Sequence, residues 1–143
     1  MLYKKIHIGS LIKKVVEEQN IDLHRICNFF NLEEKDIREM YKKNDISTDM
    51  LLKWSKIAEY DFFRIYSYHL ILYAPSKSTD FSKVKKVSSL PTFRKNLYSQ
   101  EIIDFILELL HTGKKTKKDI IDDYRIPKTT LYKWIAKHSA KGD

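Results

Sequence analysis

Residues 116–138 read TKKDIIDDYRIPKTTLYKWIAKH, and this stretch decides the fold of the second half of the chain. Thr116 and Asp119 have the spacing of a capping box, in which each side chain accepts a hydrogen bond from the backbone N–H of the other residue. A helix is therefore predicted to begin here. Pro127 suits the first position of a second helix, because its missing N–H costs nothing there. The stretch predicts two short helices that meet at a tight turn around Arg125.

The second of these helices is basic and aromatic outside its apolar stripe. Leu131, Trp134 and Ile135 recur at helical spacing and are predicted to face the core. No residue of this helix is acidic, so its exposed face suits the phosphates of a DNA groove. The alternative is that any three-helix bundle exposes a basic surface of this kind. The residues predicted to contact DNA in this region are Lys117, Arg125, Lys128, Thr129, Thr130, Tyr132, Lys133 and Lys137.

A further helix is predicted upstream, where residues 100–112 carry an apolar stripe. Ser99 can cap its start, and Gly113 suits the left-handed residue that ends it. The three helices, which end in TTLYKW, resemble the small DNA-binding domain of insertion-sequence transposases over about residues 98–138. This resemblance implies a three-helix, homeodomain-like domain with Trp134 in its core. It implies that the residues approaching bases or phosphates are Lys128, Thr129, Tyr132 and Lys133.

Residues 1–74 are predicted to form five short helices, because apolar residues repeat at helical spacing. Leu51, Leu52 and Trp54 are predicted to face the core from the fourth helix. The strings IGSLIKKVVEEQNIDLHRICNFFNLEEKDI and DISTDMLLKWSKIAEYDFFRIYS resemble the helix-turn-helix domains of Cro and phage repressors over about residues 7–73. The resemblance implies a five-helix, repressor-like domain. The five helices are expected at about residues 9–19, 22–30, 33–43, 48–58 and 61–73.

The helix at residues 33–43 would be the DNA-reading helix of such a domain, but it begins with three carboxylates in its first four residues. The first turn of a reading helix is the part that approaches bases, and carboxylates there would face phosphates at a Coulombic cost. Lys35 and Arg38 are the candidates for DNA contact on this helix. The alternative is that residues 1–74 form a dimerisation or partner-binding module.

The segment FFRIYSYHLILY, from Phe62 to Tyr73, contains more aromatic and aliphatic residues than one small core can bury. Exposed apolar area of this kind usually marks an interface. The segment is therefore predicted to be a homodimer contact. Residues 68–73 are also rich in aromatic and β-branched side chains, which allow a short strand as an alternative to helix.

The excess positive charge lies between the two helical blocks. The chain has a net charge of +8, and residues 75–98 hold six Lys/Arg against one Asp/Glu. Residues 75–97 are predicted to be a basic linker between domains at 1–74 and 98–143, because an irregular connection of this length is uncommon within one domain. Lys85 and Lys86 are predicted to follow a phosphate backbone. The alternative is a solvated linker.

Composition and motifs argue against several other classes of protein. No apolar run approaches the roughly 20 residues of a membrane span. The single cysteine, Cys27, and the lack of a signal-peptide pattern predict a cytoplasmic protein, nucleoid-associated when bound to DNA. His24 and Cys27 share a helical face but lack further ligands at zinc-site spacing. No phosphate-binding loop or nucleophile motif is visible, so no metal, no cofactor and no enzymatic activity are expected.

The expected fold is all-α, with two small helix-turn-helix domains joined by the basic linker. The favoured function is binding of double-stranded DNA as a bacterial transcriptional regulator. Two alternatives stay open: the DNA-recognition subunit or remnant of an insertion-sequence transposase without a catalytic domain, and a protein-interaction module that does not bind DNA.

Overall fold

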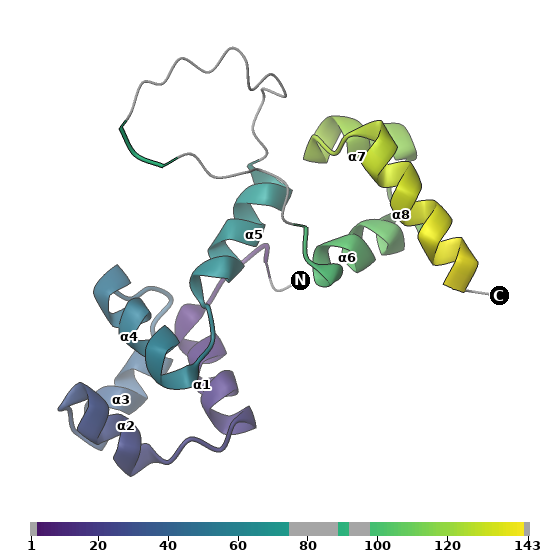
Figure 1. Ribbon diagram of the computed structural model, residues 1–143. Coiled ribbons are helices and arrows are strands. Elements are labelled where there is room, and N and C mark those ends of the chain that lie inside the picture. The colour runs from purple at the N-terminus through teal and green to yellow at the C-terminus, as the bar shows by residue number, and fades with distance from the viewer. Residues whose placement is uncertain (1–2, 75–88, 92–97, 142–143) are drawn as a thin grey trace. The chain divides into compact units, whose positions relative to one another are not determined.

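The protein is all-helical. The structure, a computed structural model, describes residues 3–74, 89–91 and 98–141, with only the backbone of residues 140 and 141 (Figure 1). No strand occurs in these ranges. The chain divides into two compact units, Met1–Leu70 and Ile71–Asp143, and each is described by itself.

The first unit contains the helices α1 to α5. Their bounds are Ile8–Glu18, Leu23–Phe30, Glu34–Tyr41, Thr48–Ala58 and Phe63–Tyr73, and the last three residues of α5 lie beyond the division between the units. Both α1 and α2 pack against α3 and α4. The turn between α2 and α3 begins with Asn31, which has a left-handed backbone (φ 53°) that asparagine tolerates better than most residues.

The core of this unit is built around Trp54 of α4, whose side chain is fully buried. Its ring packs against Phe30 of α2 at a centroid distance of 4.6 Å and against Tyr41 of α3 at 5.8 Å. Burial raises the pKa of the Tyr41 phenol above its ordinary value of 10.0. One prediction from the sequence fails in this unit. Leu52, which was predicted to face the core, is 45% exposed. Consecutive residues of a helix point in different directions around its axis, so the burial of Leu51 leaves Leu52 toward solvent.

Residues 68–73, for which a strand was the alternative, form the end of α5, so the predicted helix extends through them. Tyr68 packs edge-on against Tyr3 at 5.4 Å, and the His69 imidazole Nδ1 lies 2.5 Å from the Tyr3 carbonyl oxygen. Consecutive residues of a strand point to opposite faces, so they would not both reach Tyr3. The tertiary contact with the N-terminal segment outweighs the local preference for strand.

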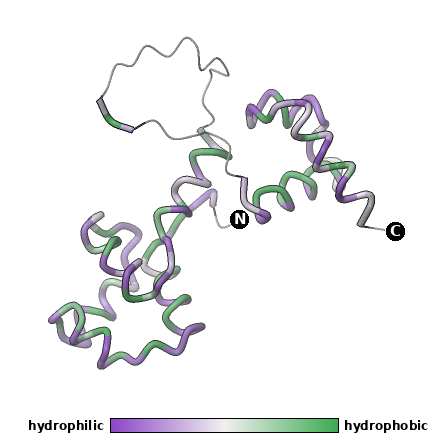
Figure 2. Tube along the Cα trace, viewed as in Figure 1, coloured by the Kyte–Doolittle hydropathy of each residue, from purple (hydrophilic) through white to green (hydrophobic). Residues whose placement is uncertain are grey.

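The second unit contains α6 (Gln100–His111), α7 (Lys117–Tyr124) and α8 (Lys128–Lys141). Both α6 and α7 pack against α8. The predicted caps are confirmed: the Ser99 hydroxyl oxygen accepts from the backbone N–H of Ile102 at 3.3 Å, and Thr116 forms the capping box with Asp119. Figure 2 shows long hydrophobic stretches along α6, whereas hydrophilic and hydrophobic residues alternate along α8.

Candidate nucleic-acid interface

The α8 helix is held in its unit by one side. Leu131 is fully buried, and Trp134 and Ile135 are half-buried beside it. The Trp134 ring meets the Tyr98 ring edge-on at 5.0 Å, and burial raises the pKa of the Tyr98 phenol. These contacts fix the rotation of α8 about its axis, and with it the set of side chains that solvent reaches.

The turn between α7 and α8 consists of Arg125, Ile126 and Pro127. Arg125 has a left-handed backbone (φ 54°, ψ 36°) and an exposed side chain, whereas Ile126 is buried. The Pro127 carbonyl accepts from the backbone N–H of Leu131 at 3.1 Å, so Pro127 precedes the helix by one residue and does not occupy its first position as predicted. The buried isoleucine anchors the turn, and the arginine is presented outward.

The exposed face of α8 is formed by residues on the side opposite Leu131. Thr129, Lys133 and Lys137 follow one another at intervals of four residues, and all three are exposed. Tyr132 lies beside them with 42% of its surface exposed. Thr130 is half-buried at the edge of this face. No ion pair occupies Lys128, Lys133 or Lys137 within the described part of the chain, so their charge is available to an external anion.

Two lysines from different helices converge on the Tyr132 ring. The Lys117 ammonium, at the start of α7, lies 5.0 Å from the ring centroid, and the Lys128 ammonium lies 5.6 Å from it. Attraction between a cation and an aromatic face holds such side chains together without neutralising the positive charge of the lysines. The structure therefore brings together three of the predicted site residues, at the end of the α8 face nearest the turn.

Among the described residues of the second unit, the acidic side chains lie on α6 and α7, and one of them is paired with a lysine outside the face. Lys115 forms an ion pair with Asp123 and lies 5.6 Å from the Tyr124 ring centroid. The hydrogen bond with Asp123 raises the pKa of Lys115 above its ordinary value. Lys115 is thus neutralised by α7 itself, whereas Lys128, Lys133 and Lys137 of α8 have no ion pair among the described residues.

The other predicted site residues lie apart from this face or outside the described residues. Lys35 and Arg38 are exposed on α3 in the first unit, where Arg38 pairs with Glu34. Lys42 pairs with Glu39, which lowers the pKa of that carboxyl, and the Asp36 carboxylate accepts from the backbone N–H of Glu33. The exposed surface of α3 therefore carries mostly compensated charge. Lys85 and Lys86 lie outside the described residues.

The chain matches no family model, no curated protein and no solved structure. The described residues contain no group of three or more His, Cys, Asp or Glu side chains that could hold a metal ion. None of the helices within residues 3–74, 89–91 and 98–141 has the length and apolar character that crossing a bilayer requires.

Sequence patterns missed one feature of the second unit. His111, Lys117 and His138 line a pocket of about 280 Å³ together with side chains of α6 and α8. The two histidines are separated by most of two helices in the sequence and follow no ligand motif, so only the fold brings them together.

Proposed function

We propose that the chain binds double-stranded DNA through the exposed face of α8, as a bacterial transcriptional regulator. The observation that carries this proposal is the charge of that face. It presents Lys128, Lys133 and Lys137 without an acidic residue on the same helix and without ion pairs in the described region. Phosphates are the complement of such a face, because neutralising them releases counterions from the DNA.

The dimensions of α8 agree with insertion into a major groove. Its 14 residues span about 21 Å at 1.5 Å per residue, and a major groove about 12 Å wide admits one helix. The exposed Thr129 occupies the part of the face where base edges would lie, and the exposed Lys133, one turn further along, would reach a phosphate. Lys117, Arg125 and Lys128 surround the beginning of the helix, where phosphates would flank the groove.

The α3 helix supports this assignment by contrast. Its first turn contains Glu34 and Asp36, and its Arg38 is already paired with Glu34. A DNA phosphate would have to compete with these carboxylates. The first unit is therefore assigned to pairing between copies of the chain, through the side of α5 that exposes Tyr66 and Leu70. In a two-fold dimer each copy of the chain would contribute one α8 helix, so that the dimer would recognise two DNA half-sites.

Fluorescence anisotropy of a labelled duplex over a salt series tests the proposal. If Lys117, Arg125, Lys128, Lys133 and Lys137 each neutralise one phosphate, the slope of log affinity against log salt is about −4.5. Affinity should then fall by roughly 500-fold between 50 and 200 mM salt. Absence of binding at 50 mM salt, or affinity that does not depend on salt, would contradict the proposal and favour a protein-interaction module.

A matched pair of variants locates the interface. Lys133→Gln should weaken binding by about tenfold and reduce the salt slope by about 0.9. Lys35→Gln removes an exposed lysine of α3 that forms no ion pair among the described residues, and it should change affinity less than about twofold. The reverse result would assign DNA contact to α3. Selecting bound fragments from genomic DNA would separate regulatory sites from the inverted repeats that a transposase subunit would favour.

A further inference from the structure

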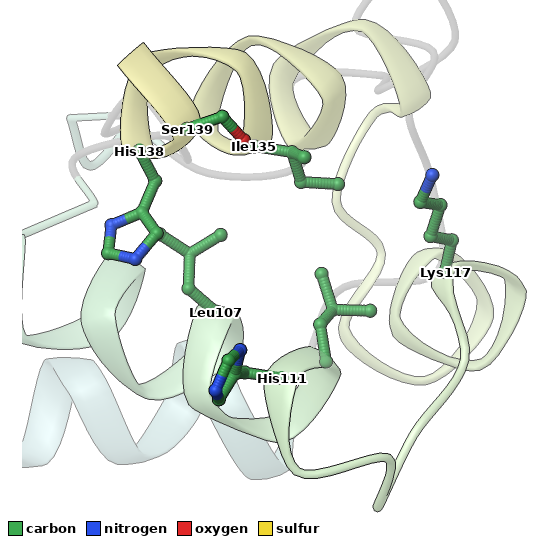
Figure 3. A pocket seen from close by; sticks show the side chains of 7 residues that line it. Leu107, His111, Lys117, Ile135, His138 and Ser139 are labelled. Atoms are coloured by element: carbon green, nitrogen blue, oxygen red, sulfur yellow. The ribbon is translucent and has the colours of Figure 1, made fainter. Parts of the chain in front are cut away.

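The second unit contains a pocket between α6, the start of α7 and the end of α8. Its apolar lining comes from Leu107 and Leu110 of α6 and Ile135 of α8, and its volume is about 280 Å³. Figure 3 shows the His111 and His138 rings on one side of the pocket and Lys117 on the other. Ligand pockets usually have volumes of roughly 300–1,000 Å³, so this one suits a molecule of about ten non-hydrogen atoms or fewer.

The polar groups around this pocket are all capable of donating hydrogen bonds. Lys117 carries a positive charge, and the imidazoles of His111 and His138 each have at least one N–H. The hydroxyl of Ser139 completes the lining, which includes no carboxylate. Lys117 has no ion-pair partner in the described part of the chain. An apolar lining with a cation and N–H donors at its rim is complementary to a small organic anion.

We propose that this pocket binds a small monocarboxylate with an apolar body, whose carboxylate pairs with Lys117 and accepts from His111 or His138. The apolar body would lie against Leu107, Leu110 and Ile135. Inorganic phosphate or sulfate would leave this apolar lining without a partner. An uncharged apolar molecule would leave the ammonium and imidazole groups unpaired at the rim.

Binding at this pocket is expected to oppose DNA binding, a consequence that rests on the proposed function. Lys117 lies 5.0 Å from the Tyr132 ring centroid, at the DNA-facing end of α8, and also lines the pocket. A carboxylate paired with Lys117 would neutralise this charge and place a negative group beside the phosphate-binding face. By linkage, DNA must then weaken binding of the carboxylate by the same factor.

Titration of the full-length chain with 4-methylpentanoate, followed through the imidazole signals in NMR spectra, tests the site. The His111 and His138 signals, assigned with His111→Gln and His138→Gln, should shift and reach saturation. The uncharged 4-methylpentanamide should bind about tenfold more weakly, because it lacks a charge-assisted hydrogen bond. Acetate, which lacks the apolar body, should also bind at least about tenfold more weakly, since it is smaller by four CH₂ equivalents. Equal binding of acid and amide, or no saturable shift, would overturn the proposal.

Two neighbouring lysines provide the matched variants. Lys117→Gln should weaken 4-methylpentanoate binding by about fivefold or more. Lys118→Gln removes an exposed lysine that does not line the pocket and should leave that affinity unchanged. A loss of affinity that is the same in both variants would indicate a general charge effect and overturn the assigned site.

The link to DNA is measured separately, so the two proposals can fail independently. At constant ionic strength, 4-methylpentanoate should weaken binding of the labelled duplex by at least about fivefold relative to chloride. Saturable carboxylate binding without any DNA binding would overturn the proposed function and leave the pocket assigned. DNA binding without carboxylate binding would overturn the pocket alone.

Discussion

The backbone N–H of Gly9, in the first turn of α1, donates to the carbonyl of Lys43, just beyond α3, at 3.0 Å. Residue 9 approaches α3 so closely that a Cβ would lie 2.4 Å from the Met40 carbonyl oxygen and 2.6 Å from two further carbonyls. These atoms are backbone and cannot move aside as a flexible side chain would. The contact joins the start of the first helix to the end of the helix with which it packs.

Gly9→Ala is expected to destabilise the first unit by roughly 1–3 kcal/mol, the usual cost of overpacking a close contact. Unfolding in urea can be followed through the fluorescence of the buried Trp54 in a Trp134→Phe background, which makes Trp54 the sole tryptophan. The transition should move to lower urea. In the same background, Gly113→Ala should leave it in place, because the strain of a side chain at the left-handed Gly113 (φ 70°) would fall in the other unit. An unshifted Gly9→Ala transition would contradict the close approach.

The capping box at the start of α7 makes a prediction about pH. Hydrogen bonds from the backbone N–H and the side chain of Thr116 hold the pKa of Asp119 below its ordinary value of 3.8. Because the pKa is lowered in the folded state, the stabilisation is complete above about pH 4 and is lost as the pH falls through the folded-state pKa. Thr116→Ala should bring the pKa of Asp119 back toward 3.8, and Thr116→Ser should not. The carboxyl carbon shift in an NMR titration measures this value. An unchanged pKa in Thr116→Ala would refute the contribution of the Thr116 side chain, since the backbone N–H is kept in that variant.

Local chemistry explains why the sequence predicted the ends of helices well. Ser99 and Thr116 act on backbone groups three residues away, so their effect is readable from short spacing. Gly113 likewise has the left-handed backbone (φ 70°) that its place after α6 indicated. Periodicity located every helix within a few residues, and the all-α fold follows from these local signals.

Contacts between distant residues were not predictable in this way. The end of α5 is helical where its composition also allowed a strand, and the contacts that hold it are made with Tyr3, 66 residues from His69. The approach of Lys117 to Tyr132 joins two helices across a turn, and no spacing rule specifies it. The pocket between His111 and His138 depends on the packing of three helices. Sequence therefore identified the basic face of α8 as a candidate, while the arrangement around it required the fold.

The exposed apolar side of α5 makes a prediction about oligomeric state. Leu70 is 58% exposed and Tyr66 is 37% exposed on the same helix, one turn apart. If this side joins two copies of the chain, Leu70→Glu should convert a dimer to a monomer, because it places a charge in an apolar contact. Light scattering measures the mass in solution. Leu52→Glu, at a comparably exposed leucine of α4, should leave the dimer intact. A monomeric wild-type chain would exclude this interface.

Arg125 combines a strained backbone with a charge at the proposed interface, and substitution can separate the two. A left-handed backbone costs a non-glycine residue roughly 1–2 kcal/mol, while the greater freedom of glycine in the unfolded chain costs about 0.5–1 kcal/mol. Arg125→Gly is therefore expected to stabilise the second unit by about 0.5–1 kcal/mol. Both Arg125→Gly and Arg125→Asn lose one positive charge, so both should reduce the salt slope of DNA binding by about 0.9.

The comparison between these two variants makes the result specific. Asparagine tolerates the left-handed backbone less well than glycine but better than arginine, so the thermal stability should rise in the order Arg, Asn, Gly. The affinity for DNA should instead fall equally in both variants, because the charge is lost in each. If stability decreases in Arg125→Gly, the arginine side chain must stabilise the turn by contacts of its own. If affinity is unchanged in both variants, the turn does not approach the phosphates, and DNA contact would be confined to α8 itself.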